Sequence, residues 1–299
     1  MKIAVLGATG FVGSALLRVL ASRHEVIGVA RRQPPGPDPS SSVRWLEADV
    51  LDAEAVRAAL EGADVVYYLV HSLGTRDFEE RDARAAENVA RAAERVGVRR
   101  LVYLGGLGDD ASDLSSHLRS RHRTGHRLAS GSVPVTTLRA AIVIGQGSAA
   151  FETIVALVQR LPMMVCPRWV TTPTQPIALD DVVHYLSEAA DHPELKGGTF
   201  DVGGPEVLTY RDMIERIGKL LGRRSRIVEV PVLTPRLSSY WLHLVTPVGA
   251  AVARPLIEGL RNETVVRDTR IRSLIPFELT PFDVASRVAL GIDAAPTDA

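Results

Sequence analysis

The chain has 299 residues, in which 35 Lys and Arg balance 35 Asp and Glu, so its formal net charge is zero. This balance argues against a nucleic-acid binder, which normally carries a basic surplus. Hydrophobic residues make up 46% of the sequence and charged residues 23%, which excludes a wholly disordered chain and suits one or two globular domains. The one cysteine, Cys166, can form neither an internal disulfide nor a cysteine-rich zinc site, and it fits a reducing, cytoplasmic environment.

Short apolar runs alternate with helical patterns over the first two-thirds of the chain. Asp52 is the expected N-cap of the second helix, and Gly97 the expected C-cap of the third. Strands that alternate with helices predict βαβ units and a parallel sheet with right-handed crossovers. The predicted strands are 2–6, 25–30, 43–46, 65–70, 101–104 and 135–138, and the predicted helices are 11–21, 53–60, 78–96 and 115–130.

The last third is rich in proline and less regular. Helices are predicted over 180–190 and 210–221, opened by Asp180 and Thr209, and a turn over 201–205. The apolar stretch 240–257 contains His243, Pro247, Arg254 and Pro255 and is too short to span a membrane. We expect no transmembrane segment, and we interpret 240–257 as a buried or interfacial segment. Residues 241–260 leave a contact with a second copy or a regulatory protein open.

A glycine-rich loop directly follows the first predicted strand and opens the first helix. Gly7 allows a tight turn, Gly10 leaves space for a pyrophosphate beside the backbone, and Gly13 lets the helix pack closely on the strand. The N-terminus of the helix offers free N–H groups and the positive end of its dipole to phosphates. The same apolar run is not typical of a signal peptide, because these glycines interrupt it. The position of the loop in a βαβ unit predicts dinucleotide binding rather than a plain turn.

The end of the second strand favours one of the two pyridine dinucleotides. It carries Arg31 and Arg32 where an acidic residue would favour NAD. Two guanidinium groups there can bind a 2′-phosphate, so we expect NADP(H), with NAD(H) as the alternative. The other interpretation treats both arginines as solvated loop charges. Asp49 and the Val50 amide, after the third strand, are candidates for binding the adenine edge.

Several segments together resemble the atypical and extended short-chain dehydrogenase/reductase superfamily, in particular its NmrA-like, NAD(P)H-binding branch, which is often described as nucleoside-diphosphate-sugar epimerase-like. The resemblance covers roughly residues 1–220. It is carried by 7–13, Asp49-Val50, 67–72, 101–107, 130–140, 175–182 and 199–210.

The resemblance implies a Rossmann-type, doubly wound parallel sheet of about seven strands with a smaller C-terminal substrate lobe. The NAD(P)-binding domain would span 1–150, with 174–205 returning to it, while 151–173 and 206–299 would form the lobe and a C-terminal extension. Gly147, Ser148, Phe151 and Glu152 would border the substrate pocket, although Glu152 also suits a helix N-terminus. The cofactor-binding residues would be Gly7, Thr9, Gly10, Phe11, Val12, Gly13, Arg31, Arg32, Asp49, Val50, Leu69, Val70, His71, Gly105, Arg121 and Ala140.

The chain departs from the superfamily where the catalysis takes place. Members use a Tyr, a Lys four residues later, and a Ser or Thr after the fifth strand. Here the corresponding positions are His117, Arg121 and the pair Gly105-Gly106. Arg121 can still bind ribose hydroxyls, although its pKa stays high, and His117 can act as an acid or a base. His122 and His126 share a zinc-compatible spacing, but the arginines around them favour no metal.

Three functions are compatible with this pattern. The first is an NADP(H)-dependent oxidoreductase on an unknown small molecule, with His117 or an ordered water supplying the proton. The second is a non-catalytic NAD(P)(H)-binding redox sensor or regulator that binds a protein partner, which the missing Tyr, Lys and Ser motivate. The third is a nucleotide-sugar epimerase or dehydratase, which is the weakest because it needs the same Tyr–Lys pair.

Overall fold

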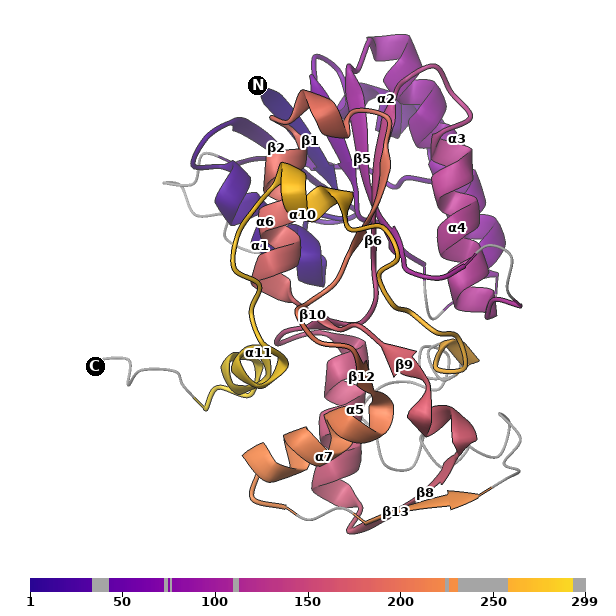
Figure 1. Cartoon of the computed structure of the whole chain (residues 1–299). Helices are drawn as coiled ribbons and strands as arrows, with labels where there is room; N and C mark the ends of the chain where they lie inside the picture. Colours follow the sequence, from indigo (N-terminus) through magenta and orange to yellow (C-terminus); the bar gives the residue numbers. More distant parts are fainter. Residues whose placement is uncertain are drawn as a thin grey trace.

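The computed structural model describes residues 1–33, 43–72, 75, 77–109, 113–223, 226–230 and 258–292. Seven parallel strands form its central sheet in the order β11-β6-β5-β4-β1-β2-β3 (Figure 1). The order reverses direction between β1 and β4, which is the switch point of a doubly wound fold. The predicted Rossmann-type α/β class is therefore confirmed. The strands are β1 (Lys2–Leu6), β2 (Glu25–Ala30), β3 (Val43–Glu47), β4 (Val65–Tyr68), β5 (Arg100–Gly106), β6 (Val135–Ala140) and β11 (Thr199–Val202).

Helices cover both faces of this sheet. In β1, Ile3 and Val5 pack into one hydrophobic cluster while Ala4 and Leu6 pack into the other. A strand that is buried on both faces needs the continuous apolar sequence seen here rather than an alternating one. The first cluster includes α1 (Phe11–Leu20), α6 (Leu179–Ala189) and α10 (Arg270–Leu274), and the second includes α2 (Ala53–Ala59), α3 (Phe78–Val96) and the end of α4 (Ser116–Leu128).

A third hydrophobic cluster forms a smaller lobe below the sheet in Figure 1. It combines α5 (Ala149–Arg160), α7 (Tyr210–Leu220) and α11 (Phe282–Ala289), and the parallel pair β8 (Met163–Pro167) and β13 (Arg226–Val230) lies beside it. Short elements lie between the lobe and the sheet: β7 (Val143–Ile144), η1 (Arg168–Thr171), β9 (Pro173–Thr174), β10 (Ile177–Ala178) and β12 (Leu208–Thr209). The short helix η2 (Pro193–Leu195) joins α6 to β11.

Local capping signals were good predictors of where helices begin and end. The Asp52 side chain accepts hydrogen bonds from the amides of Glu54 and Ala55, and Gly97 closes α3 with a φ of 75°. Thr209 forms a capping box with Asp212 at the start of α7. These three features match the sequence-based expectations.

Three other expectations were wrong. Asp180 does not cap α6, because the helix begins at Leu179 and the preceding residue is Ala178. The predicted turn at 201–205 begins inside a strand, since Asp201 and Val202 belong to β11. β5 is also longer than predicted and includes Gly105 and Gly106. The apolar stretch 240–257 lies outside the described residues. Within the described part, no helix is both long enough and apolar enough to cross a membrane.

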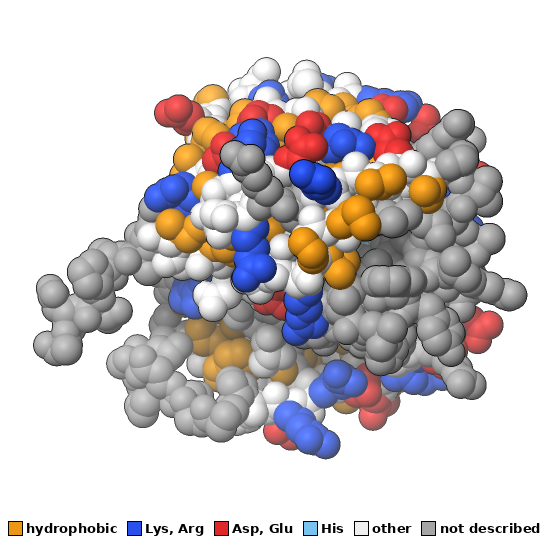
Figure 2. All heavy atoms as spheres, turned by 90° about the horizontal axis from the view of Figure 1, so that it is seen from below, with side chains coloured by type: hydrophobic (Ala, Val, Ile, Leu, Met, Phe, Trp, Pro, Cys, Tyr) orange, Lys and Arg blue, Asp and Glu red, His pale blue; other side chains and the backbone are white. Residues whose placement is uncertain are grey.

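Charged side chains of both signs lie interspersed on the face drawn in Figure 2. The Arg- and Glu-rich α3 contributes pairs of this kind, such as Arg91 with Glu87 and Arg95 with Glu54. Exposed pairs like these contribute little to stability, about 0–1 kcal/mol each, but they neutralise one another's field.

One buried ion pair attaches a C-terminal segment to the edge of the sheet. Arg139 of β6 lies directly opposite Asp201 of β11; its Nε donates a hydrogen bond of 2.8 Å to one Asp201 oxygen, and its Nη2 forms an ion pair with the same oxygen at 2.7 Å. The other oxygen accepts the backbone N–H groups of Arg267 and Asp268, both at 3.2 Å. The side chain of Asp201 is only 1% exposed, so this carboxylate depends on all four donors.

We predict that Asp201→Ala lowers the free energy of unfolding by about 2 kcal/mol or more, because it removes the acceptor of the partly buried Arg139 guanidinium and of the amides of Arg267 and Asp268. Urea denaturation of purified protein measures the loss. Arg267→Ala is the matched control: it removes only the exposed ion pair with Asp109 and keeps the amide that Asp201 accepts, so it should change stability by less than about 1 kcal/mol. Equal effects of the two substitutions would contradict this assignment.

Candidate functional site

The glycine loop forms a cradle that side chains do not enter. Gly7 has a φ of 84°, its N–H donates to the Val29 carbonyl at 3.2 Å, and its carbonyl accepts the Gly10 N–H at 2.9 Å. A Cβ atom added to Gly13 would lie 2.2 Å from the Gly7 oxygen, so only glycine lets α1 approach the loop this closely. Gly10 supplies no side-chain cap to α1, and the first turn of the helix holds no acidic residue. This helix N-terminus therefore suits an anionic group.

The residues predicted to bind the adenosine part of the nucleotide follow the strands beside the loop. Arg31 and Arg32 follow β2 directly and are exposed. After β3, the Asp49 carboxylate accepts the Leu51 N–H at 2.9 Å, while the Val50 carbonyl accepts from Asn88 at 3.1 Å. Asp49 therefore already forms a local turn, and its other oxygen is the one available to a ligand.

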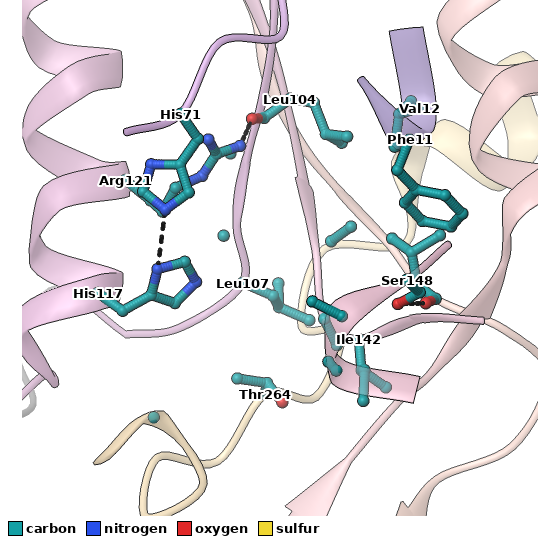
Figure 3. Close-up of a pocket in the computed structure, with 18 of the residues that line it drawn as sticks. Phe11, Val12, His71, Leu104, Leu107, His117, Arg121, Ile142, Ser148 and Thr264 are labelled. Carbon is teal, nitrogen blue, oxygen red and sulfur yellow. Dashed lines mark hydrogen bonds between the residues drawn. The ribbon is translucent and has the colours of Figure 1, made fainter. Parts of the chain in front are cut away.

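A cavity of about 520 Å³ opens between the ends of the strands and the smaller lobe (Figure 3). The structure brings ten of the predicted site residues to its wall: Gly10, Phe11, Val12, Gly13, Leu69, His71, Gly105, His117, Arg121 and Ala140. The other predicted residues do not line it: Gly7, Thr9, Arg31, Arg32, Asp49, Val50 and Val70.

The wall on the side of the lobe was only partly foreseen. Gly147 and Ser148 line the cavity as expected, but Tyr210, Leu260 and Thr264 are additions that long-range folding brings there. Glu152 accepts the Gly147 N–H at 3.0 Å, and Ser148 caps α5 through the Phe151 N–H. This contact supports a role of Glu152 at the helix N-terminus rather than in the substrate pocket. Most of the lining is apolar, including Leu107, Leu118, Ile142, Val143 and Leu260.

Helix α4 places both predicted catalytic residues at the wall. Ser115 caps the helix, and His117 and Arg121 lie one turn apart on the same face. Gly106 at the end of β5 allows this helix to come close, since a Cβ atom there would lie 2.9 Å from Leu118 Cδ2. Arg121 donates to the Leu104 carbonyl, and its guanidinium lies 5.1 Å from the centre of the Tyr103 ring.

His117 does not act alone, because a chain of hydrogen bonds continues behind it. His117 Nδ1 lies 3.1 Å from His71 Nε2, and His71 Nδ1 lies 2.7 Å from Asp82 Oδ2. Asp82 belongs to α3 and is 2% exposed. In Figure 3 the two imidazoles lie on the same side of the cavity, and both residues line it.

Sequence reasoning missed Asp82, although a signal was present. It lies on the same helical face as Phe78, Ala85, Ala86 and Val89, which are all buried. An acidic residue within the apolar stripe of a helix must find buried partners, and it therefore marks a structural or functional contact.

Burial sets the charge of the two imidazoles. It lowers the pKa of His117 to about 3, with His71 and Arg121 adding to the effect. Burial also lowers the pKa of His71, against the opposing hydrogen bond with Asp82. Burial opposes ionisation of Asp82, but its hydrogen bonds with His71 and Ser72 outweigh this, and the pKa of Asp82 is lowered. At neutral pH the site holds an ionised carboxylate and two neutral imidazoles.

Comparisons with known proteins agree with this architecture. Residues 7–141 match the sequence model of a family described as NAD(P)H-binding. Over 241 residues, 80% of its length, the chain is 31% identical to an uncharacterized protein of Mycobacterium tuberculosis. It spans only about a quarter of the length of that relative, 25%.

Solved structures share the fold over nearly the whole chain. A nucleoside-diphosphate-sugar epimerase from Staphylococcus aureus superposes with a TM-score of 0.78 at 16% identity, covering 96% of this chain and 100% of that one. An NADPH-dependent quinone oxidoreductase from Escherichia coli, complexed with NADPH, superposes with a TM-score of 0.77 at 16% identity, covering 98% of this chain and 99% of that one.

These findings agree with the predicted NAD(P)H-binding domain, and the shared fold is that of both epimerases and reductases, as the predicted resemblance implies. The protein is a Rossmann-type α/β protein with an NAD(P)H-binding domain. Neighbours of both kinds, reductase and epimerase, have this fold, and the fold alone does not distinguish their chemistries.

We predict that His117 makes the stability of the protein depend on pH. Its pKa lies below the value in the unfolded chain, so the neutral imidazole stabilises the fold. That contribution is fully present above about pH 6.5 and is lost as the pH falls toward the lowered pKa. Urea denaturation at several pH values measures the slope between pH 6.5 and 4.5.

In this experiment His117→Gln should flatten the slope by up to about 1.4 kcal/mol per pH unit, the value for one proton. His126→Gln on the exposed side of the same helix is the control, and its slope should match that of the unmodified protein. An unchanged slope in His117→Gln would mean that this imidazole is charged in the fold at mildly acidic pH.

Proposed function

We propose that the chain is an NADP(H)-dependent oxidoreductase whose substrate is an apolar small molecule that carries an alcohol or carbonyl group. The observation that carries the proposal is the position of His117. Its imidazole lies at the wall of an apolar cavity that also contains the glycine loop and the ends of β4, β5 and β6. In a doubly wound fold this is the place where a dinucleotide and its substrate meet.

The residues around the loop fit the dinucleotide. The cradle at Gly7, Gly10 and Gly13 has no side chains, and the uncapped N-terminus of α1 would hold the pyrophosphate through its N–H groups. Arg31 and Arg32 would bind a 2′-phosphate, which supports NADP(H) over NAD(H). Arg121, whose guanidinium the Leu104 carbonyl holds at the cavity wall, would bind the ribose beside the nicotinamide.

The substrate class follows from the rest of the lining. Leu107, Leu118, Ile142 and Leu260 present aliphatic surface and no charge, so they favour an apolar substrate body. This lining opposes a sugar nucleotide, whose hydroxyls and phosphates would lose their hydrogen bonds to water there. The epimerase alternative is therefore the weaker one.

When bound, the cofactor supplies or accepts the hydride, and the protein handles the proton. Neutral His117 would accept the proton of a substrate hydroxyl during oxidation and return it to the carbonyl oxygen during reduction. Arg121 would orient the ribose without exchanging a proton, because a guanidinium group is not deprotonated in proteins. The walls of the lobe would exclude water and hold the reacting carbon beside the ring.

Calorimetric titration tests the cofactor assignment. We expect NADPH to bind more tightly than NADH, and Arg31→Ala combined with Arg32→Ala to weaken NADPH by at least about tenfold while leaving NADH unchanged, because a charge-assisted hydrogen bond contributes about 1.5–3 kcal/mol. Arg18→Ala, in the last turn of α1 and away from the loop, is the control and should retain the affinity for NADPH. Tighter binding of NADH would overturn the NADP(H) assignment.

Turnover tests the role of His117. We expect oxidation of NADPH with a panel of apolar ketones, enones and quinones, and a fall in kcat of about 10²–10⁴-fold in His117→Gln, the range for removal of a general acid or base. The affinity for NADPH should stay within a few-fold of the original value. The exposed His126→Gln is the control and should retain full turnover. Full turnover of His117→Gln would remove this residue from the chemistry.

A second function is favoured by the His–Arg pair at the positions of Tyr and Lys. The chain could bind NADP(H) and signal the ratio of its two redox forms to a protein partner, without turnover. This function requires different contacts with the reduced and the oxidised cofactor. Tight NADPH binding combined with no turnover over the whole substrate panel would select it over the oxidoreductase.

A further inference from the structure

Asp82 makes contacts that suit an ionised carboxylate. Its Oδ1 accepts the Ser72 N–H at 2.8 Å, and its Oδ2 accepts the Ser120 hydroxyl at 3.1 Å. The third neighbour is His71 Nδ1, at 2.7 Å from Oδ2. A carboxylate only accepts hydrogen bonds, so the proton between Asp82 and His71 belongs to Nδ1 of the imidazole.

This proton fixes the next two groups along the chain. A neutral His71 with its proton on Nδ1 has a lone pair on Nε2, and that lone pair faces His117 Nδ1 at 3.1 Å. The hydrogen bond then requires a proton on His117 Nδ1. A neutral imidazole has a single N–H group, so His117 Nε2 carries no proton. The cavity therefore meets a lone pair rather than an N–H group.

A single added proton changes His117 Nε2 from a hydrogen-bond acceptor into a donor. If His117 Nε2 takes a proton from a substrate hydroxyl, the Nδ1 proton of His117 can pass to His71 Nε2. The positive charge then lies on His71, next to the Asp82 carboxylate, and His117 stays neutral with an N–H directed at the cavity. The same transfers in reverse return the proton to a carbonyl oxygen, so the sequence is balanced in both directions.

The surrounding charges favour His71 as the resting place of the proton. Arg121 on α4 disfavours a positive charge on either imidazole, whereas Asp82 on α3 favours one and bonds directly to His71. From the sheet, Tyr68 of β4 and Tyr103 of β5 face Asp82, and burial raises the pKa of both hydroxyls, which keeps them neutral. Phe78 approaches the His71 ring edge-on, with ring centres 6.3 Å apart.

We propose that Asp82 and His71 are positioning residues that set the tautomer of His117 and form a proton relay, Asp82–His71–His117, which holds the substrate proton on His71. The relay rests on the proposed function, whereas the tautomers follow from the hydrogen bonds between Asp82 and two neutral imidazoles. The competing interpretation is purely structural: Asp82 would tie the end of β4 to α3 and α4, and the tautomer of His117 would not depend on it.

Asp82→Asn separates the two interpretations. The Ser72 N–H can only donate, so the amide oxygen of the new Asn must stay at the Oδ1 position and its NH₂ must face His71. The NH₂ donates to His71 Nδ1, which moves the His71 proton to Nε2. His71 then donates to His117 Nδ1, and the His117 proton moves to Nε2. The substitution at position 82 thus acts through His71 and changes His117 Nε2 at the cavity wall from a hydrogen-bond acceptor into a donor.

Nitrogen-15 NMR of the full chain with labelled histidine, at neutral pH and without nucleotide, reads both tautomers directly. We expect Nδ1–H on His71 and His117 in the unmodified protein and Nε2–H on both in Asp82→Asn. Ser120→Ala is the matched control: it removes one donor to Asp82 but keeps the carboxylate, so both tautomers should stay as Nδ1–H.

Nε2–H on His117 in the unmodified protein would overturn the proposal even if Asp82→Asn failed to fold. An unchanged His117 in a folded Asp82→Asn would support the structural interpretation instead. Because the measurement needs neither cofactor nor substrate, these outcomes are independent of the NADP(H) assignment. Tautomers as expected, combined with no turnover, would disprove the oxidoreductase and leave the coupling of the three residues intact.

Discussion

One close approach that is possible only without a Cβ atom determines the geometry of the cofactor cradle. At Gly13, α1 comes so near the loop after β1 that an added Cβ would lie 2.2 Å from the Gly7 backbone oxygen. This approach exposes the N-terminus of α1, and a side chain at position 13 would push the helix away from the loop. At Gly106, α4 packs against the end of β5 with the end of the Leu118 side chain near the place of a Cβ atom, and this packing brings His117 and Arg121 to the same wall.

The cavity depends on segments that are far apart in the sequence. Strand ends within the first 140 residues form one side of its wall, and Tyr210, Leu260 and Thr264 belong to the side that faces the lobe. Thr264 is also attached to the lobe side by its hydrogen bond with the Thr174 hydroxyl, at 2.7 Å. The protein therefore completes its apolar binding space only when the C-terminal segment has packed against the sheet, which couples folding of this segment to formation of the site.

Local patterns predicted most of the fold and several of the residues that line the cavity. The glycine loop, the strand–helix alternation and the caps at Asp52, Gly97 and Thr209 depend on neighbours within a few residues, so the sequence exposes them directly. The error at Asp180 has a local cause, because the two acids at 180 and 181 both resemble an N-cap, while Asp181 instead accepts two hydrogen bonds from Thr280. Asp82 was missed because its partners lie in the loop after β4 and on α4, and only the tertiary structure brings a helix, a loop and a second helix together around one carboxylate.

The contacts of Asp201 with Arg139 and with the amides of Arg267 and Asp268, which we call the Asp201 clasp, also affect the surface of the molecule. β11 is the last strand on its side of the sheet, and a terminal strand presents backbone groups that another strand can pair with. Here the amides of Arg267 and Asp268 bind the Asp201 side chain, and Arg270 donates to the Thr199 carbonyl at 3.3 Å, so the chain's own C-terminal segment lies along β11. The seven-stranded sheet is thereby shielded at this border from edge-to-edge association with other copies, and a polypeptide in which the clasp opened would offer a template for aggregation.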